Sequence, residues 1–260
     1  MIREMLDLMM PRECLVCGRR LGAKEEHLCL YCAVDLPMTY FWERAHNPMA
    51  DQFNALLEQM RQAETEEGDV GRVDEAESGT DNDTGARERM EYAKACSLMF
   101  YHHENPFKHI PKALKYDGNI KAGRYYATML GRKMAESGNW GDVDLVIPVP
   151  LHWFRRYRRG YNQAEVIAKA VARELGARFR SDILCRKHRT KSQTKLDAAA
   201  RLRNVQGVFG VKKRCAATHV LIIDDTFTTG ATLCACYFAV RQAFGPNVRI
   251  SVATLAVVQA

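Results

Sequence analysis

The sequence predicts an α/β protein with a largely parallel sheet and helices on both faces. Two observations carry this prediction. Continuous apolar runs such as VDLVIPVP (143–150) and HVLIIDD (219–225) are typical of strands that are buried on both faces. Segments with the apolar spacing of helices alternate with such runs along the chain, and this alternation favours parallel pairing.

Further segments continue the alternation. The other predicted strands are 95–102, Ile183–Leu184, 207–211 and 248–258. The predicted helices are 106–116, 122–137, 162–176 and 232–244. Helix 162–176 has well-marked ends, because Asn162 can cap its start and Gly176 follows its last residue.

The chain of 260 residues fits one large domain or one domain with a small appendage. We expect a head at 1–36, a connector at 37–90 and an α/β domain at 91–260. Residues 61–90 contain no Leu, Ile, Phe, Tyr or Trp, so they cannot bury enough apolar surface to offset the entropy lost on ordering. We predict that they form a disordered acidic insertion, with an interaction tail as the alternative.

The charge is unevenly distributed. Residues 61–90 hold ten acids and four arginines, a net charge of −6. Since the whole chain has a net charge of +7, the remaining residues carry +13. A basic body suits an anionic ligand, such as a phosphate compound or a nucleic acid, or is simply a solvated basic face. No apolar run approaches the roughly 20 residues that cross a bilayer, and the acid-bearing N-terminus does not resemble a secretory signal. We therefore expect a cytoplasmic protein.

The head carries two C-x-x-C pairs, Cys14/Cys17 and Cys29/Cys32, with eleven residues between them. This spacing suits a structural zinc ion held by four thiolates, which leave no open coordination position. Disulfides are the alternative, and a reducing cytoplasm argues against them. His27 is a further candidate ligand, although four cysteines already suffice.

The stretch VLIIDDTFTTGATL (220–233) is the main candidate site. Ligands of open α/β sheets bind beyond the carboxyl ends of the strands, where Asp224 and Asp225 are expected. The turn that follows leads into a helix N-terminus, which favours an anion. Its predicted phosphate-binding residues are Thr226, Thr228, Thr229, Gly230 and Thr232. The carboxylates suit hydroxyl groups, so the whole stretch fits a ribose 5-phosphate. A phosphoacceptor domain or a metal site is the alternative.

Two basic segments could complete an anion site. The first, PVPLHWFRRYRRGYNQ, follows a predicted strand and offers fixed positive charge for pyrophosphate; its arginines are Arg155, Arg156, Arg158 and Arg159. The second, 186–204, is expected to be a mobile loop that closes over the pyrophosphate, with Lys191, Gln193 and Thr194 as its contact residues. A solvated surface cluster is the alternative for the first, and a nucleic-acid strip for the second.

The stretch DDTFTTGAT resembles the phosphoribosyl pyrophosphate (PRPP) motif of type I phosphoribosyltransferases. Together with KALKYDGN, VIPVPLHWFRRYRRGYNQAEVIA, KSQTKLDAAARLRNVQGVF and the cysteine head, it makes the chain similar to the competence protein F (ComF) family. This resemblance implies a type I phosphoribosyltransferase core with an N-terminal zinc ribbon. Two details depart from the family pattern: Thr226-Phe227 after the acids, and LDAAARLRN in the basic loop.

The resemblance implies an enzyme that binds PRPP with Mg²⁺ and transfers ribose 5-phosphate to an acceptor that the sequence does not identify. Asp224 and Asp225 would then be the catalytic pair that binds the ribose hydroxyls, the threonine turn would hold the 5-phosphate and the arginines would hold pyrophosphate. The alternative is a non-catalytic PRPP-binding module in DNA uptake, with single-stranded DNA or competence proteins as partners.

Overall fold

The computed structural model describes residues 12–69, 91–102, 104–115, 118–187 and 207–258. Within them, five parallel strands form one sheet in the order β1-β7-β6-β2-β3. The strands are β1 (Ala95–Tyr101), β2 (Leu145–Pro148), β3 (Arg178–Phe179), β6 (His219–Phe227) and β7 (Arg249–Val258). The predicted α/β class with a mostly parallel sheet is therefore confirmed.

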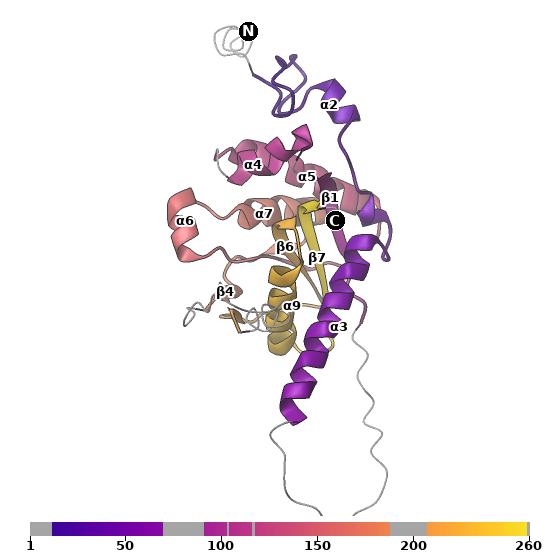
Figure 1. The fold of residues 1–260 in the computed structure, drawn as a ribbon, viewed down its shortest axis with the longest axis vertical. Helices are drawn as coiled ribbons and strands as arrows, with labels where there is room; N and C mark the ends of the chain where they lie inside the picture. The colour runs from indigo at the N-terminus through magenta and orange to yellow at the C-terminus, as the bar shows by residue number, and fades with distance from the viewer. Residues whose placement is uncertain (1–11, 70–90, 103, 116–117, 188–206, 259–260) are drawn as a thin grey trace, which may run out of the picture.

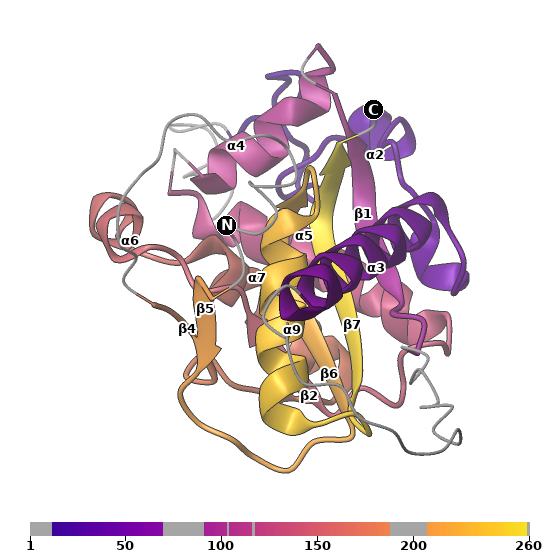
Figure 2. The ribbon, with the colours of Figure 1, turned by 60° about the horizontal axis from the view of Figure 1, so that its bottom comes forward.

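Helices cover both faces of this sheet (Figures 1 and 2). Helices α5 (Ile120–Glu136) and α7 (Gln163–Leu175) pack together on one face. Helices α3 (Pro48–Asp69) and α9 (Ala231–Phe244) lie on the other. The central residues Val220–Ile223 of β6 are fully buried between the layers, as their continuous apolar run requires.

Smaller elements complete the fold. Residues of the predicted helix 106–116 form η2 (Pro106–Lys108) and α4 (His109–Lys115), while α2 (Leu30–Val34) lies in the head and η1 (Phe41–Glu43) follows it. Strands β4 (Leu184–Arg186) and β5 (Phe209–Val211) form a separate antiparallel pair. The basic residues 188–206 between them lie outside the described residues, as do Lys191, Gln193 and Thr194.

The segment predicted as a connector packs into the body. Met49, Phe53, Leu57 and Met60 form a stripe at helical spacing on α3, and each is at most 1% exposed. The helix continues to Asp69, so the prediction of disorder is wrong for residues 61–69. Burial of the stripe anchors the preceding turns, and helix propagation from them costs little. Residues 70–90 of the predicted insertion lie outside the described residues.

The strand order creates a switch point between β2 and β6. From β2 the chain moves outward to β3 at one edge, whereas from β6 it moves through α9 to β7 on the opposite side. The connections that follow these two neighbouring strands therefore diverge and leave a crevice at the carboxyl ends, where open α/β sheets bind ligands.

Candidate functional site

Asp224 and Asp225 lie at the carboxyl end of β6, beside the switch point. The strand continues past them to Phe227, and Asp224 and Thr226 remain in register with Thr254 and Ala256 of β7. The turn therefore begins after Phe227, two residues later than predicted. The physical reason is Phe227 itself, which is 1% exposed and packs its ring edge-on to Phe53 of α3, extending the strand into the core.

The two carboxylates sit in different electrostatic environments. Burial, together with the neighbouring charge of Asp225, raises the pKa of Asp224 to about 7, although the Asp225 N–H donates to Asp224 Oδ1 over 2.8 Å. Asp225 forms an ion pair with Lys115 of α4, with 3.1 Å between Oδ1 and Nζ. Lys115 Nζ also donates to Thr226 Oγ1 over 3.2 Å. One carboxylate thus resists ionisation near neutral pH, while the other is neutralised by a lysine.

The threonine turn is shaped by its glycine. Gly230 has φ +78° and caps the start of α9, and a Cβ placed there would lie 2.8 Å from Leu56 Cδ1 and from Phe227 Cζ. A positive φ and close side-chain packing both require glycine at this position. The sequence predicted that Gly230 lets a phosphate approach the backbone, whereas its neighbours in the fold are packed side chains. Thr228, Thr229 and Thr232 are exposed and accessible to a ligand.

The arginine segment, expected as a loop, is the helix α6 (Trp153–Arg159). Its ends explain the difference, because His152 Nδ1 accepts from the Phe154 N–H over 3.3 Å and Gly160 closes the helix with φ +76°. No apolar periodicity signals so short a helix.

The arginines of α6 lie in different surroundings. Arg159 lines a cavity with Asp224 and Asp225, Arg156 lines the cavity beside it, and Arg158 is exposed. The side chain of Arg155 lies outside the described part of the chain.

The cavity at the carboxyl ends has a volume of about 290 Å³. Its charged and polar lining comes from α4, α6, α7, β4, β6 and α9 and comprises Lys115, Arg159, Asn162, Gln163, Arg186, Asp224, Asp225 and Thr232. A neighbouring cavity of about 500 Å³ shares Pro150, Leu151, Asn162 and Arg186 with it and adds further cations. Three cations and a carboxylate pair thus line one cavity, which suits a ligand that carries both anionic and hydroxyl groups.

Three charged or polar residues of this cavity were not named as site residues from the sequence. Lys115 lies on α4, far along the chain from the acidic pair, and only the fold brings it there. Arg186 opens the basic segment 186–204 that was predicted to close over the site, but it was not named as a contact, and it is the last residue of β4. The third, Gln163, accepts a hydrogen bond from Arg159 over 3.1 Å. The signal for Lys115 was present in the motif KALKYDGN, but its spacing to Asp225 carries no chemical meaning without the fold.

The four head cysteines converge. The Sγ atoms of Cys14, Cys17, Cys29 and Cys32 all lie within 4.8 Å of one another, and those of Cys17 and Cys29 are 3.7 Å apart. Four sulfurs at about 2.3 Å from a tetrahedral zinc ion lie about 3.8 Å from one another, so the cluster fits that ion. The Cys29 N–H points to Cys14 Sγ over 3.4 Å and supports a thiolate there. All nine cysteines are free, so the disulfide alternative is not supported.

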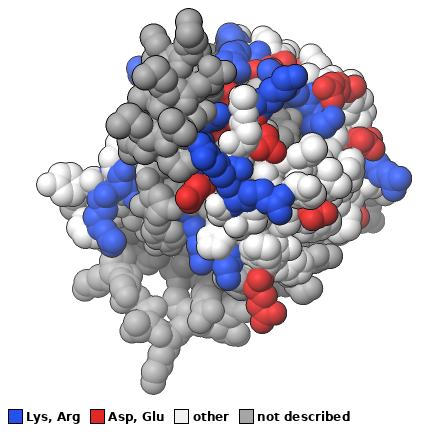
Figure 3. Space-filling view, turned by 90° about the horizontal axis from the view of Figure 1, so that it is seen from above, with Lys and Arg blue, Asp and Glu red and all other residues white. Residues whose placement is uncertain are grey.

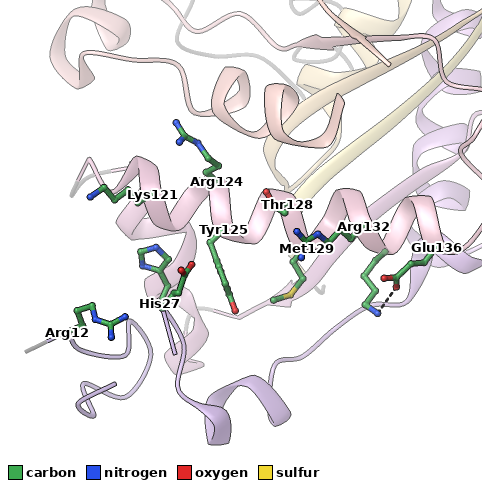
Figure 4. Close-up of a pocket in the computed structure, with 11 residues that line it drawn as sticks. Arg12, His27, Lys121, Arg124, Tyr125, Thr128, Met129, Arg132 and Glu136 are labelled. Atoms are coloured by element: carbon green, nitrogen blue, oxygen red, sulfur yellow. Dashed lines mark hydrogen bonds and ion pairs between the residues drawn. The ribbon is translucent and has the colours of Figure 1, made fainter. Parts of the chain in front are cut away.

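His27 does not join this cluster. It faces α5, where its ring meets Tyr125 edge-on with centroids 5.5 Å apart (Figure 4). Both rings line a groove of about 700 Å³ between the head and α5, which also contains Arg12, Lys121 and Arg124. A second groove of about 580 Å³ shares Arg124 with the first, and it shares Arg156 with the basic cavity beside the acidic pair. The basic grooves therefore adjoin one another from the head to the carboxyl ends.

The helices that the structure describes include none with the length and apolar character needed to span a bilayer.

Comparisons with known proteins place these features in context. No family model matches the chain. The chain is 30% identical to competence protein F of Haemophilus influenzae over 142 residues, which cover 52% of this chain and 62% of that protein. It is 36% and 34% identical to the DNA utilization protein YhgH of Escherichia coli and of Salmonella typhi over 90 residues, which cover 40% of each. The similarity thus spans less than two thirds of these relatives, and it confirms the resemblance to the competence protein F family that the sequence motifs indicate.

Proposed function

We propose that the cavity at the carboxyl ends of β2 and β6 binds PRPP and that the protein is phosphoribosyltransferase-like, with a type I core over residues 91–260. The observation that carries this proposal is the carboxylate pair Asp224 and Asp225 beside an exposed threonine turn, in one cavity with three cations. Carboxylates accept hydrogen bonds from the ribose hydroxyls, and the turn at the start of α9 offers N–H and hydroxyl donors to a 5-phosphate.

Each group has a role in the proposed transfer. Pyrophosphate departs from C1′ of the ribose, and positive charge develops on the ring as it does. Arg159 and Arg186 would hold the leaving pyrophosphate from the cavity wall. Mg²⁺, when bound with PRPP, would supply further positive charge to the leaving group. Asp224 and Asp225 orient the ring and favour its developing positive charge. A nucleophilic atom of the acceptor then forms the bond to C1′ that pyrophosphate gives up, and the proton on that atom is released to solvent.

Calorimetric titration of PRPP with Mg²⁺ tests binding, and pyrophosphate release with nucleobase acceptors tests transfer. We expect the double variant D224N/D225N to lose at least about tenfold in affinity, because charge-assisted hydrogen bonds contribute about 1.5–3 kcal/mol each. Unchanged affinity would refute the site. Binding without pyrophosphate release would instead support the non-catalytic module.

A second candidate function is the binding of single-stranded DNA, since the names of the relatives refer to competence and to DNA utilization. The observation that favours it is the groove between the head and α5, where Lys121 and Arg124 flank the aromatic rings of His27 and Tyr125. Cations that follow a phosphate backbone, together with rings on which bases stack, are typical of single-strand binding. Figure 3 shows the molecule from the end that carries the head, where lysine and arginine side chains recur with acidic groups between them.

Binding of a fluorescent oligonucleotide at several salt concentrations tests this function. We expect K121S/R124S to weaken binding and to reduce the salt slope by about 0.7 for each phosphate that the variant no longer neutralises. K24S changes an exposed head lysine outside the groove-lining set and serves as the control. Equal slopes for all three proteins would exclude the groove as the DNA surface.

The metal and the location belong to the same proposal. One zinc ion held by Cys14, Cys17, Cys29 and Cys32 would stabilise the head over residues 1–36. Four reduced thiolates require a reducing compartment, so we place the protein in the cytoplasm.

A further inference from the structure

We infer that the groove of about 580 Å³ along α7 is a second anion site and that it binds a nucleoside polyphosphate. The inference goes beyond the proposed function, because the groove is separate from the cavity at the carboxyl ends. Of the residues that line the groove, only Asn162 also lines that cavity. Three features of the lining carry the inference, namely cations without partners, an apolar floor and a single carboxylate.

One face of α7 forms most of the groove. The lining residues on this helix recur at the spacing of successive turns; they are Glu165, Val166, Lys169, Ala170 and Arg173. Arg124 of α5 and Arg156 of α6 also line the groove, so cations from three helices meet there. The lining thus sets four cations against one acid, and this balance favours an anionic ligand.

Most of the positive charge in the groove is not neutralised by the protein. Within the part of the chain that the structure describes, the side chains of Arg124, Arg156 and Lys169 form no hydrogen bond or ion pair. Other cations of the same layer do find acids, as Arg132 of α5 shows by pairing with Glu174 of α7 over 3.2 Å. The three unpaired groups are therefore available to phosphate oxygens of a ligand from solution.

The rest of the lining favours an organic phosphate over an inorganic one. Tyr161, Val166 and Ala170 form an apolar floor that a nucleoside can cover, whereas an inorganic phosphate gains nothing from it. The Tyr161 hydroxyl donates to the Leu114 carbonyl, and this bond holds the ring in place. The Glu165 carboxylate, which has no partner among the described residues, can accept hydrogen bonds from ribose hydroxyls. Together the cations, the carboxylate and the floor fit the three parts of a nucleoside polyphosphate.

The experiment titrates ATP, adenosine and inorganic triphosphate by calorimetry without Mg²⁺, so that the phosphates keep their full charge. We expect ATP to bind the parent more tightly than either fragment, because only ATP uses both the cations and the floor. K169S/R173S should lose about tenfold in affinity for ATP, since each exposed charge pair contributes modestly. K24S/K112S removes the same charge at exposed positions outside the groove-lining set and should bind ATP as the parent does.

These substitutions should leave the fold intact. Lys169 is exposed and unpaired within the described residues. Arg173 pairs with Glu174 over 2.6 Å, but Glu174 keeps Arg132 as a partner when Arg173 is changed. Loss of such an exposed pair costs little stability. K169E is a second variant that breaks no ion pair of the parent, and it should also weaken ATP binding. The melting temperature of each variant confirms that folded proteins are compared.

Titration of PRPP with Mg²⁺ separates this inference from the proposed function. D224N/D225N should lose affinity for PRPP and keep its affinity for ATP, whereas K169S/R173S should do the reverse. A parent that binds ATP in the expected way but does not bind PRPP would refute the proposed function and support the groove site.

Several results would overturn the groove site. They are a parent that does not bind ATP, an affinity for ATP that K169S/R173S and K169E leave unchanged, and an equal loss in K24S/K112S. Inorganic triphosphate that binds as tightly as ATP would show that the floor selects no nucleoside. An oligonucleotide without terminal phosphates that binds through Lys169 and Arg173, when ATP does not, would assign the groove to nucleic acid instead.

Discussion

Asp224 combines burial with a nearby carboxylate, and both disfavour its charged form. The pKa of this carboxyl is raised to about 7, whereas an aspartate in an unfolded chain has a pKa of about 3.9. Between these values the folded state binds more protons than the unfolded state, so the free energy of unfolding falls as pH rises from about 4 through 7. The site thus holds a carboxylate at a cost in stability, which is typical of binding residues.

We therefore predict that the free energy of unfolding falls less for D224N than for the parent as the pH rises from 5.5 to 8. The amide keeps the size of the side chain and removes its ionisation. Urea unfolding at both pH values measures the difference, and D35N, at an exposed position after α2, is the control. An equal decline in the parent and in D224N would show that the acid pair does not destabilise the fold.

His219 makes the opposite contribution at the other end of β6. It is 1% exposed, its Nε2 lies 2.8 Å from Ser251 Oγ, and its Nδ1 lies 3.0 Å from Asp142 Oδ2. A serine, a histidine and an aspartate linked by such contacts suggest a hydrolytic triad. However, Ser251 is 3% exposed near the amino end of β7, away from the candidate cavity, so we interpret the group as structural.

Burial lowers the pKa of His219, and the Asp142 carboxylate only partly opposes this effect. The unfolded chain therefore takes up a proton more readily, and stability is lost as pH falls below about 6.5. We predict that H219Q, which stays neutral, loses less stability than the parent between pH 7 and 5.5. Thermal unfolding at these two pH values checks this, and a steeper loss in H219Q would contradict it.

At the scale of elements, regular patterns predicted structure well and short irregular ones did not. Helix 162–176 is confirmed as α7, with Asn162 as its N-cap and Gly176 in the left-handed conformation after its end. Helix α6 was missed, because its WFRRYRR sequence has no apolar stripe. The stripe on α3 was present in the sequence, but the acidic composition that follows it favoured a prediction of disorder.

The cap of α7 also shapes the site. Asn162 Oδ1 accepts from the Ala164 N–H over 3.2 Å, and its Nδ2 donates to the Val149 carbonyl over 2.9 Å. One side chain therefore joins the start of α7 to the segment that follows β2. The sequence predicted the cap but could not predict the second bond, which depends on how the chain returns to the sheet.

We predict that N162A is destabilised by about 1–3 kcal/mol, since it loses a helix cap and leaves a buried carbonyl without its donor. N162S should lose less, because serine can cap the helix although it is too short to reach Val149. Urea unfolding gives both values, and ligand titration should show weaker PRPP binding for N162S than for the parent. Equal stability of all three proteins would exclude a structural role for Asn162.

At the scale of the whole molecule, the sequence predicted the metal cluster because C-x-x-C spacing is local. It could not predict that the head packs on α5, because Tyr125 and His27 are far apart in the chain. The same limit applies to the carboxyl-end cavity, whose charged and polar lining comes from six separate elements. The acidic pair and the threonine turn are contiguous and were predicted, whereas Lys115 of α4 reaches them only through the way the chain folds.

The head and the body should respond differently to loss of zinc. Among the described residues 12–36 of the head, the buried apolar side chains are few and include two of the cysteines; they are Cys14, Val16, Leu21, Leu28, Cys29 and Leu36. So small a cluster gains little stability from burial, and we expect the proposed zinc ion to supply the missing free energy. The α/β body has its own extensive core and should remain folded without the ion.

We predict that chelation releases about one zinc ion per chain and exposes the head to trypsin at Arg19, Arg20 and Lys24, while the sheet signal in circular dichroism persists. Oligonucleotide binding should weaken, because the head supplies Arg12 and His27 to the groove on α5. The affinity for ribose 5-phosphate should not change, because none of the described residues that line the carboxyl-end cavity comes from the head. C14S should reproduce this pattern and C215S, outside the cluster, should not. A head that stays resistant to trypsin after complete removal of metal would contradict the zinc site. Equal weakening of both ligands would instead show that the head supports the carboxyl-end cavity as well.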